Sequence, residues 1–188
     1  FKEASELATF GARVLHPRTI KPAIKAGIPV RVLNSFNPNG EGTLIVEKPN
    51  LKNPARSVCV KRGIVLVNIY SEEMLLQKGF LAKVFSLFAK HDISIDLVTV
   101  SEVSISITLD NSNKIDDVVA ELKKFSMVSI KKGVGIVSVI GEGISQSAET
   151  ITEIFTSFRE KIPIRMVSLG TIDINISFVV DVEHVEKA

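Results

Sequence analysis

The sequence is poor in several residue types that would favour particular classes of protein. It has no tryptophan, one tyrosine and a single cysteine, Cys59, among 188 residues. One cysteine excludes an internal disulfide and a multi-cysteine zinc site, and no secretory segment opens the chain, so we expect a reducing, cytoplasmic setting. The longest apolar runs, such as Val134 to Ile140, end far short of the roughly 20 residues that a membrane span needs. We therefore expect a soluble protein with no membrane partner.

The sequence also carries little net charge and few groups suited to metal or phosphate. Its 23 Lys and Arg against 21 Asp and Glu leave +2, which gives no electrostatic reason to expect nucleic acid. His16, His91 and His184 lie far apart with no ligand spacing, so no metal site is expected. The stretch Gly141-Glu142-Gly143 lacks the third glycine of a dinucleotide fingerprint, and a turn between strand and helix is the favoured interpretation.

The sequence has enough apolar residues, 45%, to form a core, and its length suits one medium domain or two small ones. Residues 1–46 predict the order helix, helix, strand, turn, strand. Residues 47–56 combine prolines, asparagines and charges of both signs, as linkers do, so a domain boundary is expected there. Because helical spacing starts at Phe1, we expect this chain to be a fragment.

An internal repeat after the linker predicts the architecture. Adding 69 or 70 to nine apolar positions reaches an apolar residue each time, and each copy predicts a strand, a helix and two further strands. The pairs are Val84/Ile154, Phe85/Phe155, Phe88/Phe158, Ile93/Ile162, Ile95/Ile164, Val98/Val167, Val103/Ile172, Ile105/Ile174 and Ile107/Ile176. In the first copy, a helix at 114–125 and a strand at 127–131 complete a ferredoxin-like βαββαβ order.

The second copy has no fourth strand in residues 181–188, and strand counting leads to the hypothesis that residues 57–62 supply it. The expected fold class is therefore α+β, with two ferredoxin-like βαββαβ domains. The first domain would span 63–132 and be inserted in the second, which would comprise 57–62 and 133–188.

Two patterns predict which side chains are buried in the first copy. Period-two alternation in the strand 103–109 places alternate residues inside, and helical spacing gives the helix 80–90 one apolar stripe. On the strand, the residues expected to face inward are Val103, Ile105, Ile107 and Leu109, and those expected to face outward are Ser104, Ser106 and Thr108. On the helix, the residues expected to face inward are Phe80, Leu81, Val84, Phe85 and Phe88.

One group of polar residues in the first copy suggests a ligand. The helix that opens at Gly79 and Phe80 offers free N–H groups to a carboxylate. Asp96 and the pair Ser101-Glu102, which we expect near one end of the sheet, suit an ammonium group, whereas Arg165 replaces Asp96 in the second copy. An amino acid, lysine above all, would fit. The residues alone leave open the alternative of a solvated aspartate and an ordinary turn glutamate.

Several of these stretches resemble one family, the aspartate kinases. Residues 1–8 and 10–19, continuing into 28–30 and 42–45, resemble the end of the aspartate kinase catalytic domain, which would give residues 1–46 that identity. Residues 79–85 and 95–104 resemble the first ACT domain of lysine-sensitive, single-function aspartokinases. The resemblance spans essentially the whole chain.

The resemblance implies a parent enzyme that phosphorylates the side-chain carboxylate of L-aspartate with ATP and Mg²⁺, on the route to lysine, threonine and methionine. It also implies a homodimer that binds L-lysine as inhibitor at or near the interface of paired ACT domains. Asp96 would take an ammonium group and the backbone of 79–81 the carboxylate, while Gln77 replaces a serine found in relatives. The implied effector contacts are Met74, Gly79, Phe80, Leu81, Asp96, Ser101, Glu102 and Val103.

The same resemblance limits what this chain can do alone. Arg13 stands where the family has a nucleotide-binding lysine. The phosphate loop and the aspartate-binding residues of the family do not occur in the sequence, so we expect no catalytic residue, no bound cofactor and no activity in this fragment. Three alternatives stay open: an ACT module for another amino acid such as threonine, a module that only dimerises, and an active kinase.

Overall fold

The computed structural model describes residues 1–9, 17–47, 54–75, 77–110, 114–158, 162–170 and 174–188. The chain divides into two compact units. The first comprises residues 1–60, 138–159 and 169–176, and the second comprises residues 61–137, 160–168 and 177–188. Each unit is described by itself below.

The N-terminal part of the first unit has the expected order of elements. Two helices, α1 (Lys2–Thr9) and α2 (Pro17–Ala26), precede the strands β1 (Val30–Val32) and β2 (Thr43–Ile45). The two strands pair antiparallel and form a sheet of their own. Within this unit, the carboxylate of Glu3 in α1 accepts a hydrogen bond from the backbone N–H of Glu142 at 2.9 Å.

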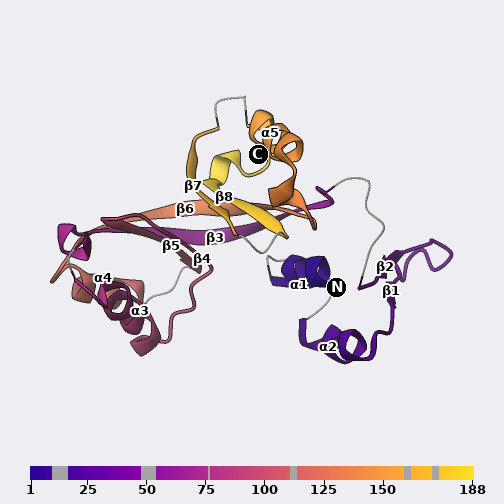
Figure 1. Ribbon diagram of the computed structural model, residues 1–188, viewed down its shortest axis with the longest axis horizontal. Coiled ribbons are helices and arrows are strands. Elements are labelled where there is room, and N and C mark those ends of the chain that lie inside the picture. Colours follow the sequence, from indigo (N-terminus) through magenta and orange to yellow (C-terminus); the bar gives the residue numbers. More distant parts are fainter. Residues whose placement is uncertain (10–16, 48–53, 76, 111–113, 159–161, 171–173) are drawn as a thin grey trace. The chain divides into compact units, whose positions relative to one another are not determined.

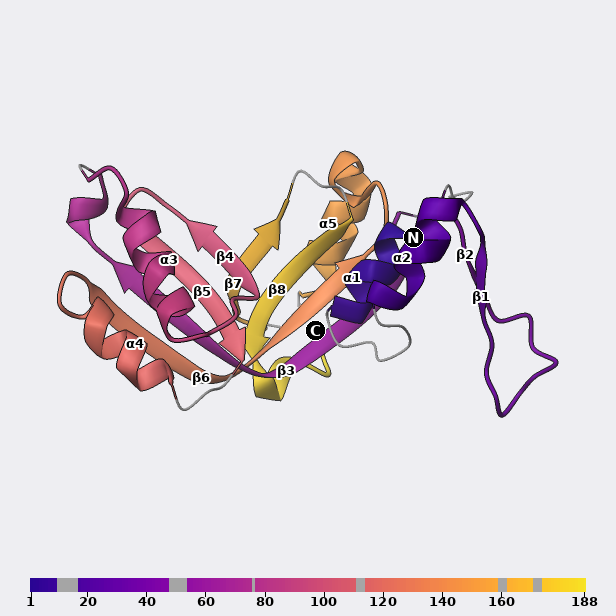
Figure 2. The same ribbon diagram turned by 90° about the horizontal axis from the view of Figure 1, so that it is seen from below.

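The larger sheet has six strands in the order β4-β5-β3-β6-β8-β7 (Figures 1 and 2). Its first four strands have the neighbours that a ferredoxin-like βαββαβ unit requires, with the first and last strands of the unit, β3 and β6, side by side. The bounds are β3 (Ser57–Tyr70), β4 (Leu97–Val100), β5 (Ser104–Asp110), β6 (Met127–Ile140), β7 (Ile164–Leu169) and β8 (Asn175–Asp181).

Two strands are longer than the sequence predicts, because each joins two expected strands: 57–62 and 64–70 in β3, and 127–131 and 134–140 in β6. β3 and β6 are both 14 residues long and continuous. Each contains one glycine with positive φ, Gly63 at 76° and Gly133 at 73°, a conformation that glycine adopts readily. These glycines lie 70 residues apart and therefore occupy equivalent places in the two copies of the repeat.

The helices α3 (Phe80–Lys90) and α4 (Ile115–Leu122) cover one face of the sheet in the second unit (Figure 1). They enclose a hydrophobic core formed with alternate residues of β3 and β5. Its buried members are Val65, Val67, Ile69, Phe80, Val84, Phe88, Ile105, Ile107, Leu109, Ile115, Val118, Val119 and Leu122. Helix α5 (Ala148–Ser157) belongs to the first unit and is capped at its N-terminus by Ser147, whose hydroxyl accepts from the Thr150 N–H.

The burial pattern confirms most of the predicted core and corrects two positions. Ile105, Ile107 and Leu109 are fully buried, as expected. Thr108 was expected to face outward but is also fully buried, and its hydroxyl oxygen accepts a 2.9 Å hydrogen bond from the backbone N–H of Leu97, which satisfies this buried polar group. Leu81 was expected inside but is 37% exposed, since it lies at the border of the apolar stripe of α3.

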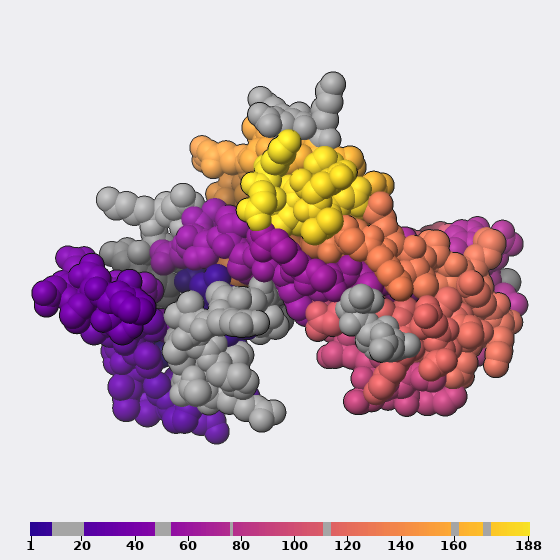
Figure 3. Space-filling view, turned by 180° about the vertical axis from the view of Figure 1, so that it is seen from behind, coloured from indigo at the N-terminus to yellow at the C-terminus, as the bar shows by residue number. Residues whose placement is uncertain are grey.

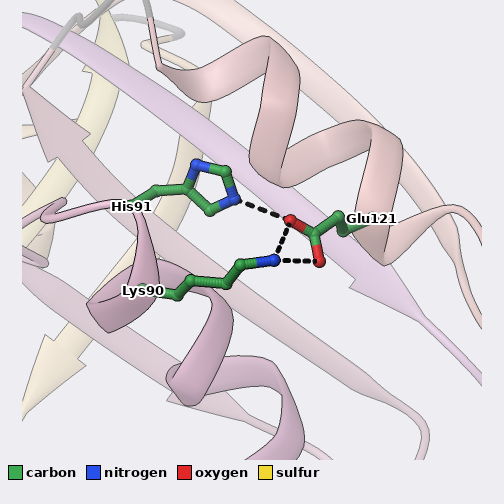
Figure 4. A network of polar contacts seen from close by, with 3 residues as sticks. All are labelled: Lys90, His91 and Glu121. Carbon is green, nitrogen blue, oxygen red and sulfur yellow. Dashed lines mark hydrogen bonds and ion pairs between the residues drawn. The ribbon is translucent and has the colours of Figure 1, made fainter.

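A polar contact joins α3 to α4 at the surface (Figure 4). The Glu121 carboxylate accepts from the Lys90 ammonium at 2.8 Å and lies 2.7 Å from the His91 ring. These two hydrogen bonds lower the pKa of Glu121 to about 2, the bond from Lys90 contributing most. The carboxylate therefore stays ionised well into the acid range.

The C-terminal segment packs against β6 through a glycine. A Cβ atom at Gly135 would lie 2.7 Å from Val185 Cγ2, so only glycine lets the segment approach this closely. Val185 is buried, and the C-terminal segment to which it belongs forms the surface drawn in yellow in Figure 3. In the described part of the chain, no helix is long and apolar enough to cross a membrane.

Candidate functional site

The turn between β4 and β5 brings the predicted residues Ser101, Glu102 and Val103 to one end of the second unit. Ser101 donates its backbone N–H to the carbonyl of Ser104 at 2.8 Å, and the two hydroxyl groups lie 2.6 Å apart. Glu102 is exposed at the tip. The Val103 carbonyl accepts from the Ser71 N–H at 2.9 Å, which fixes the turn against the end of β3.

The start of α3 lies at the same end. Gly79 has φ 85°, in the left-handed region, and no side chain caps the helix by a hydrogen bond. Phe80 is buried, with its ring edge-on to the Phe125 ring at 5.7 Å. Ser71 donates its hydroxyl to the Phe125 carbonyl at 3.3 Å, which links this helix start to the β4–β5 turn. Seven predicted contacts thus lie on elements that meet here: Met74, Gly79, Phe80, Leu81, Ser101, Glu102 and Val103.

Asp96 lies at the opposite end of β4 from this group. Its backbone N–H donates to the Thr108 carbonyl at 2.8 Å, directly before Leu97 pairs with Thr108. Five residue steps of extended strand, about 16 Å, separate Asp96 from Ser101. The expectation that Asp96 and Glu102 share one end of the sheet is therefore wrong for a single copy, because β4 runs its full length between them.

The Asp96 carboxylate is largely buried and only half satisfied. Its side chain is 20% exposed, and Oδ1 accepts from the Lys61 ammonium at 2.7 Å. Oδ2 is buried, and the described part of the structure gives it no hydrogen-bond partner. A solvated aspartate on an open strand face does not fit this arrangement. A buried carboxylate oxygen without a donor is costly, and an ammonium group would satisfy it.

Lys61 connects Asp96 to a second carboxylate. Its ammonium lies 3.1 Å from Asp110 Oδ1, and Asp110 itself is 70% exposed. Burial alone would lower the pKa of Lys61, but its hydrogen bonds to Asp96 and Asp110 outweigh burial and raise it. Lys61 is therefore an ammonium ion held between two carboxylates.

The second copy of the repeat contains a cluster of opposite charge at the equivalent place. Lys131 follows Lys61 by 70 residues, and Arg165 takes the position of Asp96. Asp181 follows Asp110 by 71 residues, which is the offset between the observed strands β5 and β8 and corrects by two residues the offset of 69 expected for this strand. Asp181 accepts from Arg165 at 2.6 Å and lies 3.0 Å from the Lys131 ammonium. The bond from Arg165 contributes most to lowering the pKa of Asp181. In this cluster, two cationic side chains share the Asp181 carboxylate. It therefore has no acceptor comparable to Asp96 Oδ2 for the ammonium group of a ligand.

The remaining candidates are outside these two clusters. Arg13 lies outside the described residues. Burial and the nearby Glu6 raise the pKa of the Cys59 thiol to about 11, so it stays protonated at neutral pH.

Neither Lys61 nor Asp110 was predicted from the sequence as a site residue. The spacing of about 70 residues that links them to Lys131 and Asp181 was the signal that could have identified both.

Comparison with known proteins establishes the family. A family model described as ACT domain matches residues 67–124 and 137–188. The chain belongs to the ACT-domain family. This confirms the predicted fold of two ferredoxin-like ACT domains.

The relatives of this ACT protein are aspartokinases, as the resemblance implied. It is 42% identical to aspartokinase 1, chloroplastic, of Arabidopsis thaliana, over 99% of its own length and 34% of the relative. It is 37% identical to lysine-sensitive aspartokinase 3 of Escherichia coli, over 100% of its length and 43% of the relative. The structure of E. coli aspartokinase III in complex with lysine and aspartate matches with a TM-score of 0.83 and 37% identity, over 98% of this chain and 42% of that one. The chain thus spans less than half the length of these relatives.

Proposed function

We propose that this chain is the regulatory region of an aspartokinase and binds L-lysine as an allosteric inhibitor. The observation that carries the proposal is the buried, unsatisfied Oδ2 of Asp96 in the first ACT domain. Similarity to an aspartokinase named as lysine-sensitive supports it. The whole protein would transfer a phosphoryl group from ATP, with Mg²⁺, to L-aspartate. Lysine would act by binding one arrangement of the enzyme more tightly than another.

The proposal includes the predicted division of the chain. Residues 1–46 would be the end of the catalytic domain, with Arg13 at the nucleotide, and 47–56 a linker. The ACT domains would be 63–132 and, around it, 57–62 with 133–188. ATP and Mg²⁺ would bind to the full-length enzyme and not to this chain alone. The compartment would be the cytoplasm, although the Arabidopsis relative is named as chloroplastic.

A homodimer through β4 would bring the separated site residues together. β4 is an edge strand of the sheet, and Val100 on it is 49% exposed. Edge strands can pair with a second chain, and a two-fold axis makes β4 pair with itself in antiparallel orientation. Asp96 of one copy would then lie beside the Ser101-Glu102 end of the other. Because about 16 Å separates Asp96 from Ser101 within one copy, each site would combine Asp96 of one copy with Ser101 and Glu102 of the other, and each dimer would have two equivalent sites.

Lysine matches the chemistry of such a site better than threonine does. Its carboxylate would be bound by the free N–H groups and the dipole at the start of α3, beside Gly79. Its two ammonium groups would pair with Asp96 Oδ2 and the Glu102 carboxylate. Threonine has only one ammonium group, so it would leave one acid without a partner.

Thermal unfolding with added amino acids tests the proposal. A ligand at 100 times its Kd stabilises the folded state by about 2.7 kcal/mol, so lysine should raise the unfolding midpoint by several degrees. Threonine and methionine at equal concentration are the controls. A larger response to threonine would favour the alternative amino-acid sensor. A dimer in sedimentation that responds to no amino acid would reject the sensor and favour a module that only dimerises.

A further inference from the structure

The position of Lys61 affects how tightly the first ACT domain would bind its effector, an inference that rests on the proposed function. Lys61 occupies one oxygen of the Asp96 carboxylate, at 2.7 Å, and leaves the other without a partner. An effector ammonium bound to Oδ2 would therefore share Asp96 with the ammonium of Lys61. From ordinary hydrogen-bond lengths, the two nitrogen atoms would lie about 5 Å apart.

Two positive charges at this distance in a partly buried site repel each other appreciably. The repulsion is little screened by water, because the side chains of Lys61 and Asp96 are only 22% and 20% exposed. Asp110 does not cancel it fully, since its carboxylate is 70% exposed and its charge is correspondingly screened. Asp110 instead holds the Lys61 ammonium in place, 3.1 Å from its Oδ1.

We propose that Lys61 is an internal competitor for Asp96 that weakens effector binding and so sets the concentration at which the sensor responds. Lys61 neutralises part of the Asp96 charge and places a fixed cation beside the site of the incoming ammonium. If Lys61 instead oriented Asp96 for the ligand, its removal would weaken binding, so the sign of the change in affinity separates the two roles.

The second copy of the repeat provides a matched control. Lys131 occupies the position equivalent to Lys61 and is bound to Asp181 at 3.0 Å, but Arg165 replaces the acceptor that Asp96 provides. Neutralising Lys131 removes the same kind of charge from the same kind of strand, at a place where no effector ammonium is expected.

The experiment is a calorimetric titration of L-lysine into the full chain, into Lys61→Met and into Lys131→Met. Lysine should bind Lys61→Met with a Kd at least fivefold lower than wild type, while Lys131→Met should match wild type. The Lys61→Met gain should largely persist at high salt, since partly buried charges about 5 Å apart are screened much less than exposed ones. Lys61→Gln, which keeps a polar end without the charge, serves as the second variant if Lys61→Met does not fold.

The outcomes separate this inference from the proposed function. An unchanged or higher Kd in a folded, charge-neutral Lys61 variant would overturn the competitor role, even though wild type binds lysine. An equal gain in Lys131→Met would overturn it too, because the effect would then reflect total charge only. Absence of lysine binding in wild type and in every variant would reject the proposed function and this inference with it.

Discussion

Asp96→Asn is the substitution that most directly changes the proposed ammonium site while keeping its shape. The Asp96 side chain is only 20% exposed, so water screens its ion pairs weakly. Removing one partner of a buried, hydrogen-bonded charge pair costs about 2 to 5 kcal/mol of binding free energy. At the lower limit this is a roughly 30-fold increase in the Kd for lysine. An exposed pair would instead cost less than about 1 kcal/mol.

The same substitution should change folding stability less than binding. The asparagine carbonyl can still accept from Lys61, so only the charge assistance of that bond is lost, about 1 kcal/mol of unfolding free energy. Calorimetry gives the Kd and urea denaturation gives the stability. Asp181→Asn, which removes the carboxylate charge that Arg165 and Lys131 share in the second ACT domain, is the control and should leave the Kd unchanged. A change of less than threefold in a folded Asp96→Asn dimer would refute the role of Asp96.

Two further predictions concern the elements that hold the site. Thr108→Val removes the buried hydroxyl oxygen that accepts from the Leu97 N–H at 2.9 Å, so it should lower the unfolding free energy by about 1 to 3 kcal/mol. Urea denaturation measures this, and a loss below about 0.5 kcal/mol would contradict the role of that bond in holding β4. Glu121→Gln should lower thermal stability at pH 5 and above, where the paired carboxylate is ionised. Because the pKa of Glu121 is lowered to about 2 from 4.5, that stabilisation is lost as pH falls through this interval. Calorimetric scans should therefore show wild type and Glu121→Gln converging near pH 2, and a constant difference across the acid range would contradict the assignment.

Local sequence pattern was sufficient to predict most elements. The helix Phe80–Lys90 has the bounds that apolar periodicity predicts, because its apolar side chains recur at a short, regular spacing along the sequence. Periodicity could not show that β3 is one strand of 14 residues, because Gly63 interrupts the pattern without ending the pairing.

The site was harder to predict because its geometry depends on pairing between distant segments. Asp96 and Glu102 are close in sequence, yet an extended strand places them at opposite ends of β4. Lys61, the partner of Asp96, lies 35 residues away and meets it only through strand pairing in the sheet. Thr108 is likewise fully buried and accepts a bond from the edge strand, whereas alternation alone places it outside.

Mixing two variants tests whether the effector site is completed by a second copy of the chain. In the proposed dimer, Asp96→Ala impairs one side of each site and Glu102→Gln impairs the other, so each homodimer should bind lysine weakly. Heterodimers formed by mixing and re-equilibrating the two variants would have one site with both substitutions and one with neither. Calorimetry should then show wild-type affinity at one site per heterodimer. If the mixture binds no more tightly than its separate components, although sedimentation shows that the subunits have exchanged, the site does not form across two copies.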